Sequence, residues 1–157
     1  MKGDQCPNSE IVFKAILQEH YDAKEERFHS SLFKGPESSL SRLAVWSKKQ
    51  IINGFIDQLH KPPKHFLMGV GSATVSRLKQ ICIEYKDKPT AIDVIEDPLD
   101  GTQKGCHVNP SHAIIPQRLS PGLAKDIPKK IEIEWGTLEQ LLSNAERKGC
   151  FSKFFRR

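Results

Sequence analysis

Residues 105–122, GCHVNPSHAIIPQRLSPG, concentrate the side chains best able to do chemistry in this 157-residue sequence. Cys106, His107 and His112 belong to the residue types that bind zinc. Adjacent cysteine and histidine side chains seldom ligate one ion together, and the stretch supplies no fourth ligand. We therefore expect no metal at this place.

The same stretch favours a turn followed by a strand. Asn109 and Pro110 form a dipeptide that is typical of turns. We expect His112 to begin the strand with its ring bonded to a backbone carbonyl, because half-buried histidines usually find such partners.

A second group of reactive residue types lies in residues 29–42. Several serines accompany His29 and Arg42 there, among them Ser30, Ser31, Ser39 and Ser41. A catalytic triad needs a base within reach of the nucleophile and a third group that orients the base. The sequence has no G-x-S-x-G elbow, and serines beside a turn are typical turn formers, so we expect no triad.

Residues 68–75, MGVGSATV, place Gly69 and Gly71 after an apolar stretch and before a predicted helix. A loop of this kind at a helix N-terminus is a general anion site. It lacks the third glycine of the dinucleotide fingerprint and the Gly-Lys-Ser of the P-loop. We therefore predict a close-packed turn between a strand and a helix.

Several of these residues, in their order along the chain, resemble a loose family of small bacterial proteins of unknown function. The shared pattern covers about residues 28–127 and runs SS-x-F…SLS…DP…NPSHA. This chain has Arg42 where the family often has an acid, and Gln117 and Arg118 where it often has a glycine and a lysine. The resemblance implies no activity. It implies that five residues are neighbours in space: Ser31, Arg42, Asp97, Asn109 and His112.

The elements that position these residues follow from periodicity and from turn and cap residues. The predicted strands are residues 27–33, 39–46, 65–71, 90–97, 111–116 and 129–135. The predicted helices are residues 9–17, 47–59, 72–85, 120–127 and 137–145. Three helix starts carry capping signals: the pair Ser47 and Gln50, the pair Thr137 and Gln140, and the N-cap Ser120.

Because strands and helices interleave without regular βαβ units, the sequence predicts an α+β (mixed α/β) fold. We expect about six short strands in a mixed sheet, with one layer of helices packed on one face. Residues 1–149 are expected to form a single globular domain, since a chain of this length can bury an ordinary core. Residues 150–157 are expected to form a separate basic and aromatic tail.

The composition excludes several classes of protein. Apolar residues make up 38% and charged residues 27%, which is typical of a soluble globular chain. No apolar run approaches the roughly 20 residues of a membrane span. The first ten residues lack the apolar stretch of a signal peptide, so we expect a cytoplasmic protein. The four cysteines form no C-x-x-C pair and are expected to be free thiols: Cys6, Cys82, Cys106 and Cys150.

The net charge of +5 comes from the end of the chain. Residues 147–157 hold five bases and no acid, which leaves 19 bases and 19 acids elsewhere. Three phenylalanines beside these bases predict a segment that binds a partner protein or folds back on its own domain. The alternative is weak binding to an anionic surface such as nucleic acid. The expected contact residues are Phe151, Lys153, Phe154, Phe155, Arg156 and Arg157.

Two hypotheses about function follow. The first is a non-enzymatic interaction or regulatory module, an accessory subunit of a larger bacterial protein assembly, because no complete catalytic motif is present. No cofactor motif is present either, and none is expected to bind. The sequence does not set the oligomeric state.

The second hypothesis is an enzyme or binding protein for a nucleotide or phosphorylated ligand. Residues 27–35, RFHSSLFKG, resemble the histidine-and-serine strand of ADP-ribosyl-transfer folds. This hypothesis requires His29, Ser31, Arg42 and His112 to converge in one pocket. The full set of candidate pocket residues is His29, Ser31, Arg42, Asp97, Asn109 and His112.

Overall fold

The computed structural model describes residues 3–102 and 107–146. Two sequence predictions lie outside the described residues: those on Cys106 and on the tail of residues 150–157. Within the described part of the chain, no helix has the length and apolar character needed to cross a membrane.

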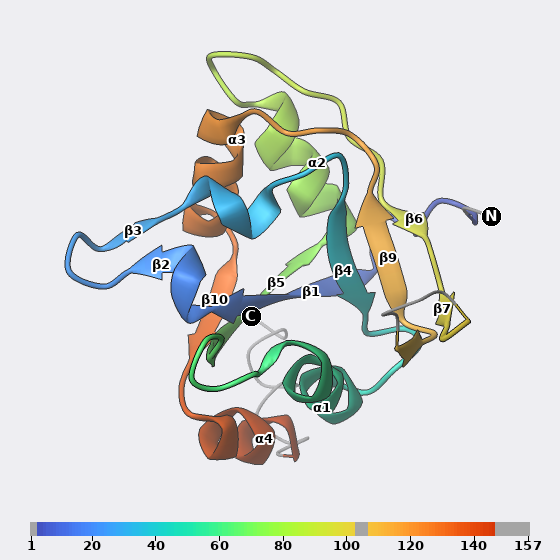
Figure 1. Cartoon of the computed structure of the whole chain (residues 1–157). Helices are drawn as coiled ribbons and strands as arrows, with labels where there is room; N and C mark the ends of the chain where they lie inside the picture. Colours follow the sequence, from blue (N-terminus) through green and yellow to red (C-terminus); the bar gives the residue numbers. More distant parts are fainter. Residues whose placement is uncertain (1–2, 103–106, 147–157) are drawn as a thin grey trace, which may run out of the picture.

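A six-stranded sheet runs through the middle of the molecule (Figure 1). Its strands follow the order β10 (Glu132–Trp135), β5 (Leu67–Thr74), β1 (Ile11–Leu17), β4 (Ser38–Arg42), β9 (His112–Ile115) and β6 (Ile95–Glu96). The predicted α+β class and six strands are confirmed. The sheet is antiparallel throughout, however, and not mixed. The reason is that β4 and β5, which a helix connects, do not pair, because β1 lies between them and runs antiparallel to both.

Smaller elements complete the fold. Two short ladders pair β2 (Tyr21–Asp22) with β3 (Arg27–Phe28), and β7 (Leu99–Asp100) with β8 (Val108–Asn109). The α-helices are α1 (Lys48–Leu59), α2 (Val75–Ile83), α3 (Pro121–Asp126) and α4 (Leu138–Glu146). The 3-10 turns are η1 (Gln18–His20), η2 (Ser30–Phe33) and η3 (Ile127–Lys129).

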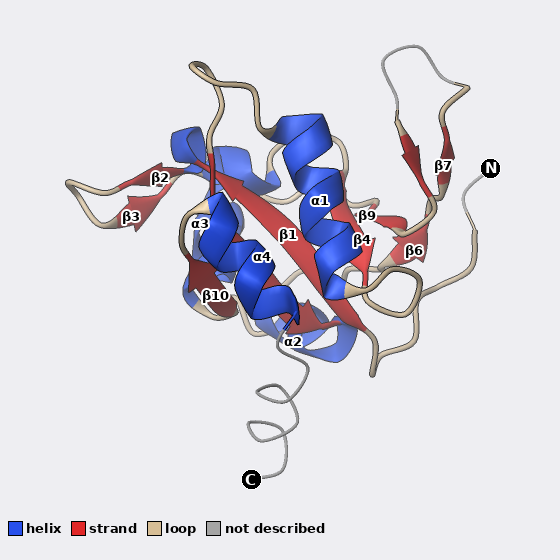
Figure 2. Cartoon of the chain, turned by 90° about the horizontal axis from the view of Figure 1, so that it is seen from below, coloured by secondary structure: helices blue, strands red, loops and turns tan. Residues whose placement is uncertain are grey.

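Helices cover both faces of the sheet, whereas the sequence predicted one layer. One core receives buried residues of α2, α3 and η2, including Leu78, Leu123 and Phe33. The other core receives residues of α1 and α4, including Ile51 and Leu141. In Figure 1 the two groups of helices lie on opposite sides of the strands, and Figure 2 shows α1 and α4 side by side across β1. We name these the α2–α3 face and the α1–α4 face.

The first predicted helix, residues 9–17, is wrong, because this segment contains strand β1. β1 lies between β5 and β4, and its side chains enter both cores. Val12 and Ile16 face the α2–α3 core, while Phe13, Ala15 and Leu17 face the α1–α4 core. A strand buried on both faces loses the apolar-polar alternation of a half-buried strand. Its apolar residues then match helical spacing by coincidence.

Two predicted strands are shorter in the structure. Of residues 90–97, only Ile95 and Glu96 pair with β9, because the N-terminal segment lies along the other side of this stretch. There the amides of Cys6 and Gly3 donate to Val94 and Glu96. Residues 27–33 form the short strand β3 and then the 3-10 turn η2.

The three predicted capping signals are confirmed. Ser47 and Gln50 cap α1 reciprocally, and Thr137 and Gln140 bond in the same way before α4. The Ser120 hydroxyl accepts the Leu123 amide at the start of α3. These caps satisfy backbone amides that a helix leaves without an internal partner.

The glycines of residues 68–75 lie inside strand β5 and not in a turn before α2, so the predicted strand-to-helix turn is wrong. Both allow β10 to approach closely. A Cβ at Gly69 would lie 3.0 Å from the Trp135 ring, and one at Gly71 would lie 2.9 Å from Ile131 Cδ1. Trp135 is 43% exposed and stacks on Phe28 with ring centroids 5.9 Å apart.

We predict that Gly71→Ala destabilises the fold by about 1–2 kcal/mol, because the new methyl group overlaps Ile131. Ile131→Val removes the overlapping Cδ1 atom. In the Ile131→Val background, the cost of Gly71→Ala should therefore fall by at least half. Urea unfolding of the four proteins measures this coupling. Equal costs in the two backgrounds would show that the contact with Ile131 is not the reason for glycine.

Candidate functional site

Arg42, at the end of β4, forms an ion cluster with two glutamates. Its Nε donates to both carboxylate oxygens of Glu10 at 3.0 and 3.1 Å, and its Nη2 lies 2.9 Å from Glu10 Oε1. Its Nη1 donates to Glu96 Oε1 at 2.8 Å. The Glu10 side chain is only 5% exposed and that of Glu96 is 36% exposed. All three guanidinium nitrogens thus contact a carboxylate inside the protein, with Glu10 as the buried partner.

Two described cysteines are buried and poorly suited to nucleophilic chemistry. Burial raises the pKa of the Cys6 thiol to about 11; Arg42 opposes this shift and Glu10 adds to it. Burial alone raises the pKa of Cys82 to about 11. The thiolate is the reactive form, so neither residue is a reactive cysteine at neutral pH. Cys82 lies on the apolar side of α2.

His112 has the backbone partner predicted for it. Its Nδ1 lies 2.8 Å from the carbonyl oxygen of Asp97 and 3.1 Å from the Asp97 carboxylate. The Asn109 side chain accepts the Ser111 amide and hydroxyl at 3.1 and 2.7 Å, across the predicted turn at Pro110. Ser111 is fully buried, and its carbonyl accepts the Arg42 amide. Asp97, Asn109 and His112 therefore hold the β8–β9 turn in place.

Arg42 and His112 lie on neighbouring strands but point to opposite faces of the sheet. Arg42 pairs with Val12, which faces the α2–α3 core. On β9, Ala113 belongs to the same core, so the preceding His112 points to the other face. The two side chains cannot act on one small ligand.

His29 and Ser31 lie at a different place. The His29 amide donates to the carbonyl of His20, which follows the C-terminal end of β1. Arg42 pairs near the beginning of β1, five residues of strand away, which is roughly 17 Å. The structure thus brings Arg42, Asp97, Asn109 and His112 to one end of the sheet and leaves His29 and Ser31 apart. The four residues required by the nucleotide hypothesis do not converge.

His20 is a titratable residue that the sequence did not single out. Its Nδ1 accepts the Leu17 amide at 3.0 Å, so the ring is oriented by the backbone. Burial lowers its pKa to about 4, and the positive charge of Lys14 contributes. His20 is therefore neutral at pH 7. Lys14 was not predicted as a candidate site residue either, although a lysine inside the apolar run IVFKAIL indicates an unusual environment for its charge.

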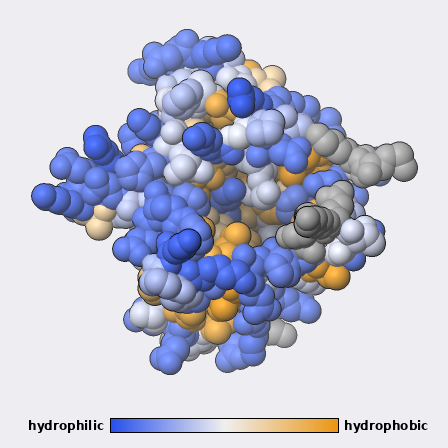
Figure 3. All heavy atoms as spheres, viewed as in Figure 1, coloured by the Kyte–Doolittle hydropathy of each residue, from blue (hydrophilic) through white to orange (hydrophobic). Residues whose placement is uncertain are grey.

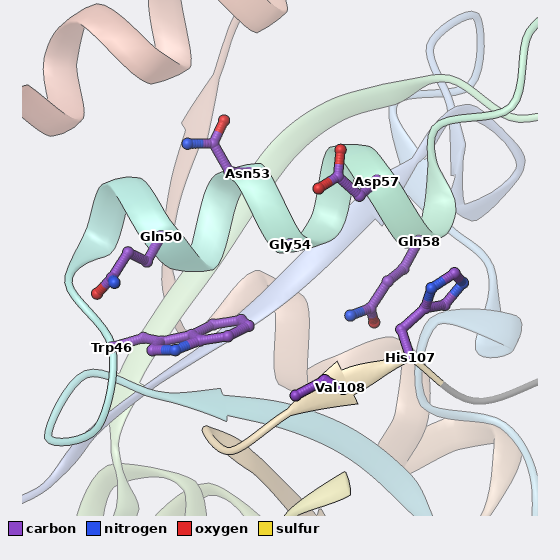
Figure 4. A pocket seen from close by; sticks show the side chains of 8 residues that line it. All are labelled: Trp46, Gln50, Asn53, Gly54, Asp57, Gln58, His107 and Val108. Atoms are coloured by element: carbon purple, nitrogen blue, oxygen red, sulfur yellow. The ribbon is translucent and has the colours of Figure 1, made fainter. Parts of the chain in front are cut away.

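A groove of about 360 Å³ lies between α1 and β8 (Figure 4). Trp46 lies beneath Gly54, where a Cβ would come within 3.0 Å of the indole ring. Gln58 and His107 lie near each other at one end, and Val108 forms the wall opposite α1. The lining residues are Trp46, Gln50, Asn53, Gly54, Asp57, Gln58, His107 and Val108.

Gln50 caps α1, but other polar side chains around this groove form no hydrogen bond within the described part of the chain. The side chains of Asn53, Asp57 and Gln58 form no hydrogen bond with another residue of the described part of the chain. Val108 is 64% exposed. The groove could not be predicted directly from the sequence, because its two sides are about 50 residues apart along the chain. The one available signal was the row of amide and acid side chains along α1.

Neither family models, curated proteins nor solved structures give a match to this chain. Within residues 3–102 and 107–146, no three histidine, cysteine, aspartate or glutamate side chains are grouped so that they could hold a metal ion. The surface in Figure 3 is mainly hydrophilic, with apolar residues showing in its lower half, where Figure 1 places α1 and α4.

We predict unequal effects when the two partners of Arg42 are removed. Glu10→Ala should cost about 3 kcal/mol or more, because it leaves Arg42 without its buried partner. Glu96→Ala should cost about 1 kcal/mol or less, because Glu96 is more exposed. Chemical unfolding of both variants measures the difference. Equal costs would contradict a buried ion pair centred on Glu10.

We predict that His20 makes the fold sensitive to acid. Its pKa is lower in the folded chain than in the unfolded one, so the unfolded chain binds more protons between about pH 6.5 and pH 4. Its contribution to stability is present above this window and is lost as the pH falls through it. His20→Asn keeps an acceptor for the Leu17 amide and removes the titration. Over this window the free energy of unfolding should fall by about 2 kcal/mol less in the variant than in the wild type. Urea unfolding at each pH measures this difference. Parallel losses would exclude His20 as the source.

Proposed function

We propose that this chain is a non-enzymatic interaction module, an accessory subunit that holds an extended segment of a partner protein in the α1–β8 groove. The observation that carries the proposal is the set of unengaged polar side chains around this groove, beside the exposed Val108. By contrast, three of the candidate pocket residues use their side chains for bonds within the protein: Arg42, Asn109 and His112.

The chemistry of the groove fits a peptide. The flat Trp46 ring and Val108 offer apolar contact, and aromatic residues are enriched where proteins bind each other. The Gln58 amide both donates and accepts hydrogen bonds, as peptide groups do. Asp57 is the one carboxylate among the lining residues, so the preferred segment is neutral or basic.

The tail of residues 150–157 is proposed as a second contact with the same partner. Its phenylalanines supply apolar area and its bases suit an acidic rim. In this proposal the protein acts in the cytoplasm and regulates or supports the larger bacterial assembly that its partner belongs to.

We predict that a photo-crosslinking residue at position 108 captures one defined protein in the host cell, through one defined segment. A synthetic peptide of that segment should bind the purified wild-type protein. Val108→Glu should weaken this binding at least tenfold, because a carboxylate replaces apolar contact in the groove. Fluorescence anisotropy of the labelled peptide measures the affinity.

The matched control is position 83. Ile83 is 51% exposed, like Val108, but lies on α2, on the other side of the sheet. A crosslinker there should not capture the same segment, and Ile83→Glu should leave peptide binding unchanged. If both positions capture the same proteins, or if neither variant affects the peptide, the groove is not the binding site.

We expect no stabilisation by nucleotides, because the residues that would hold one do not converge. A ligand present at 100 times its Kd stabilises a fold by about 2.7 kcal/mol. A thermal-shift screen with adenine, guanine and nicotinamide nucleotides should therefore stay flat. A clear rise with one nucleotide would favour the second hypothesis over the interaction module.

A further inference from the structure

Lys14 lies in the middle of β1, the strand that contributes to both cores. It shares the α2–α3 face with Val12 and Ile16, which are buried on either side of it. Lys14 itself is partly buried. A lysine at such a position is costly unless its charge is compensated, because apolar surroundings disfavour the ammonium form.

The interactions that offset the positive charge of Lys14 are weak. Lys14 Nζ donates to the backbone carbonyl of Ser39 at 3.0 Å. It also lies 5.4 Å from the centre of the Phe33 ring, which provides a cation–π contact. In the described part of the chain Lys14 has no ion pair with a carboxylate.

The side chain lies among mainly apolar residues, and Ser72 is the one polar uncharged side chain that lines the cavity beside it. The cavity has a volume of about 10 Å³, a space for about one water molecule. Its walls come from β1, η2, β4, β5 and α2, together with Ile131, and Lys14 is the one titratable residue among them. The nearby titratable group that responds to the charge of Lys14 is His20 of η1, itself neutral at pH 7.

These surroundings change the acid–base state of the amine. Burial lowers the pKa of Lys14 to about 8. An ordinary lysine has a pKa near 10.4, so at pH 7 the neutral amine is roughly 100-fold more abundant at Lys14 than at an exposed lysine. The exposed Ser39 at the end of the side chain leaves the amine within reach of solvent.

We propose that Lys14 is a nucleophilic amine and a site of covalent attachment for small uncharged aldehydes. The Nζ lone pair attacks the carbonyl carbon, the C–N bond forms as the C=O π bond breaks, and one Nζ proton passes to the carbonyl oxygen to give a neutral carbinolamine. The carbinolamine loses its hydroxyl group and the Nζ proton together as water, which leaves an imine. Desolvated lysines in apolar pockets carry out this chemistry in enzymes. The apolar walls favour an uncharged partner, since a charged aldehyde would lose its hydration there.

The test is the reaction of the wild-type protein with propanal and cyanoborohydride, which reduces each imine to a stable secondary amine. Peptide mass spectrometry follows every lysine over time from pH 6 to pH 10. At pH 7, Lys14 should react at least about tenfold faster than Lys79, since it holds more of the neutral amine. Lys79 is the matched comparison, because it is also partly buried and its Nζ donates to Asn8 at 2.9 Å. The rate at Lys14 should level off above about pH 8.

Two controls test whether the fast reaction depends on the folded protein and on Lys14 itself. In urea above the unfolding transition, the preference for Lys14 should disappear, because it depends on the folded surroundings. Lys14→Arg should remove the fast phase and leave the other lysines unchanged. If Lys14 reacts no faster than Lys79 in the folded wild type, or if the preference survives unfolding, the proposal is wrong whatever the variant does.

Discussion

Strand β1 is covered on both faces, so it supplies side chains to two cores at once. Val12 and Ile16 enter one core, and Phe13, Ala15 and Leu17 enter the other. Burial of one such large apolar side chain contributes about 1.5–3 kcal/mol. A slip of one residue would exchange the two faces of the strand. The registers of β4 and β5, and hence the positions of both helix layers, follow from this strand.

The two bases near this strand are accommodated in different ways. At the end of the sheet, Arg42 has a buried carboxylate partner in Glu10, which directly precedes β1. In the middle of the sheet, Lys14 has a carbonyl and an aromatic ring as partners but, among the described residues, no carboxylate. An ion pair fixes the protonation state of both partners, whereas a lone buried amine shifts toward its neutral form. The first arrangement is structural, and the second leaves a group with reactivity of its own.

The sequence was most informative where local chemistry decides the structure. The capping residues Ser47, Ser120 and Thr137 mark real helix starts, because a cap depends on neighbours three residues away. The backbone partner of His112 and the turn at Pro110 were predictable for the same reason. The helix predicted for residues 9–17 was wrong, because burial on both faces of β1 arises only after distant strands pair with it. The glycines at 69 and 71 look like a phosphate loop in sequence, but their role depends on β10, about 60 residues later.

The candidate site was even harder to predict from the sequence than the fold. Alternation along β4 and β9 separates Arg42 from His112, although the two strands are neighbours. Residues directly opposite each other on neighbouring strands share a face, but His112 lies opposite Ser41 and not Arg42, and this register cannot be read from the sequence. The residues of the shared pattern therefore came together partly, as a structural cluster around Ser111, while Ser31 remained at the other end of the sheet.

The α1–β8 groove follows from the topology of the chain. α1 connects β4 to β5 and lies on the α1–α4 face, while β8 leads into β9, which pairs with β4. Both connections therefore meet beside β4, outside the cores. Loops and helix surfaces at such a place are free of the packing constraints that fix β1 and its neighbours. Polar side chains there need not form hydrogen bonds within the protein. Those of Gln58 and Asp57 form none with the described residues. This fold thus uses buried polar groups to fix strand register, whereas the groove at its rim joins segments that are distant along the chain, where the sequence pattern alone gives the weakest signal.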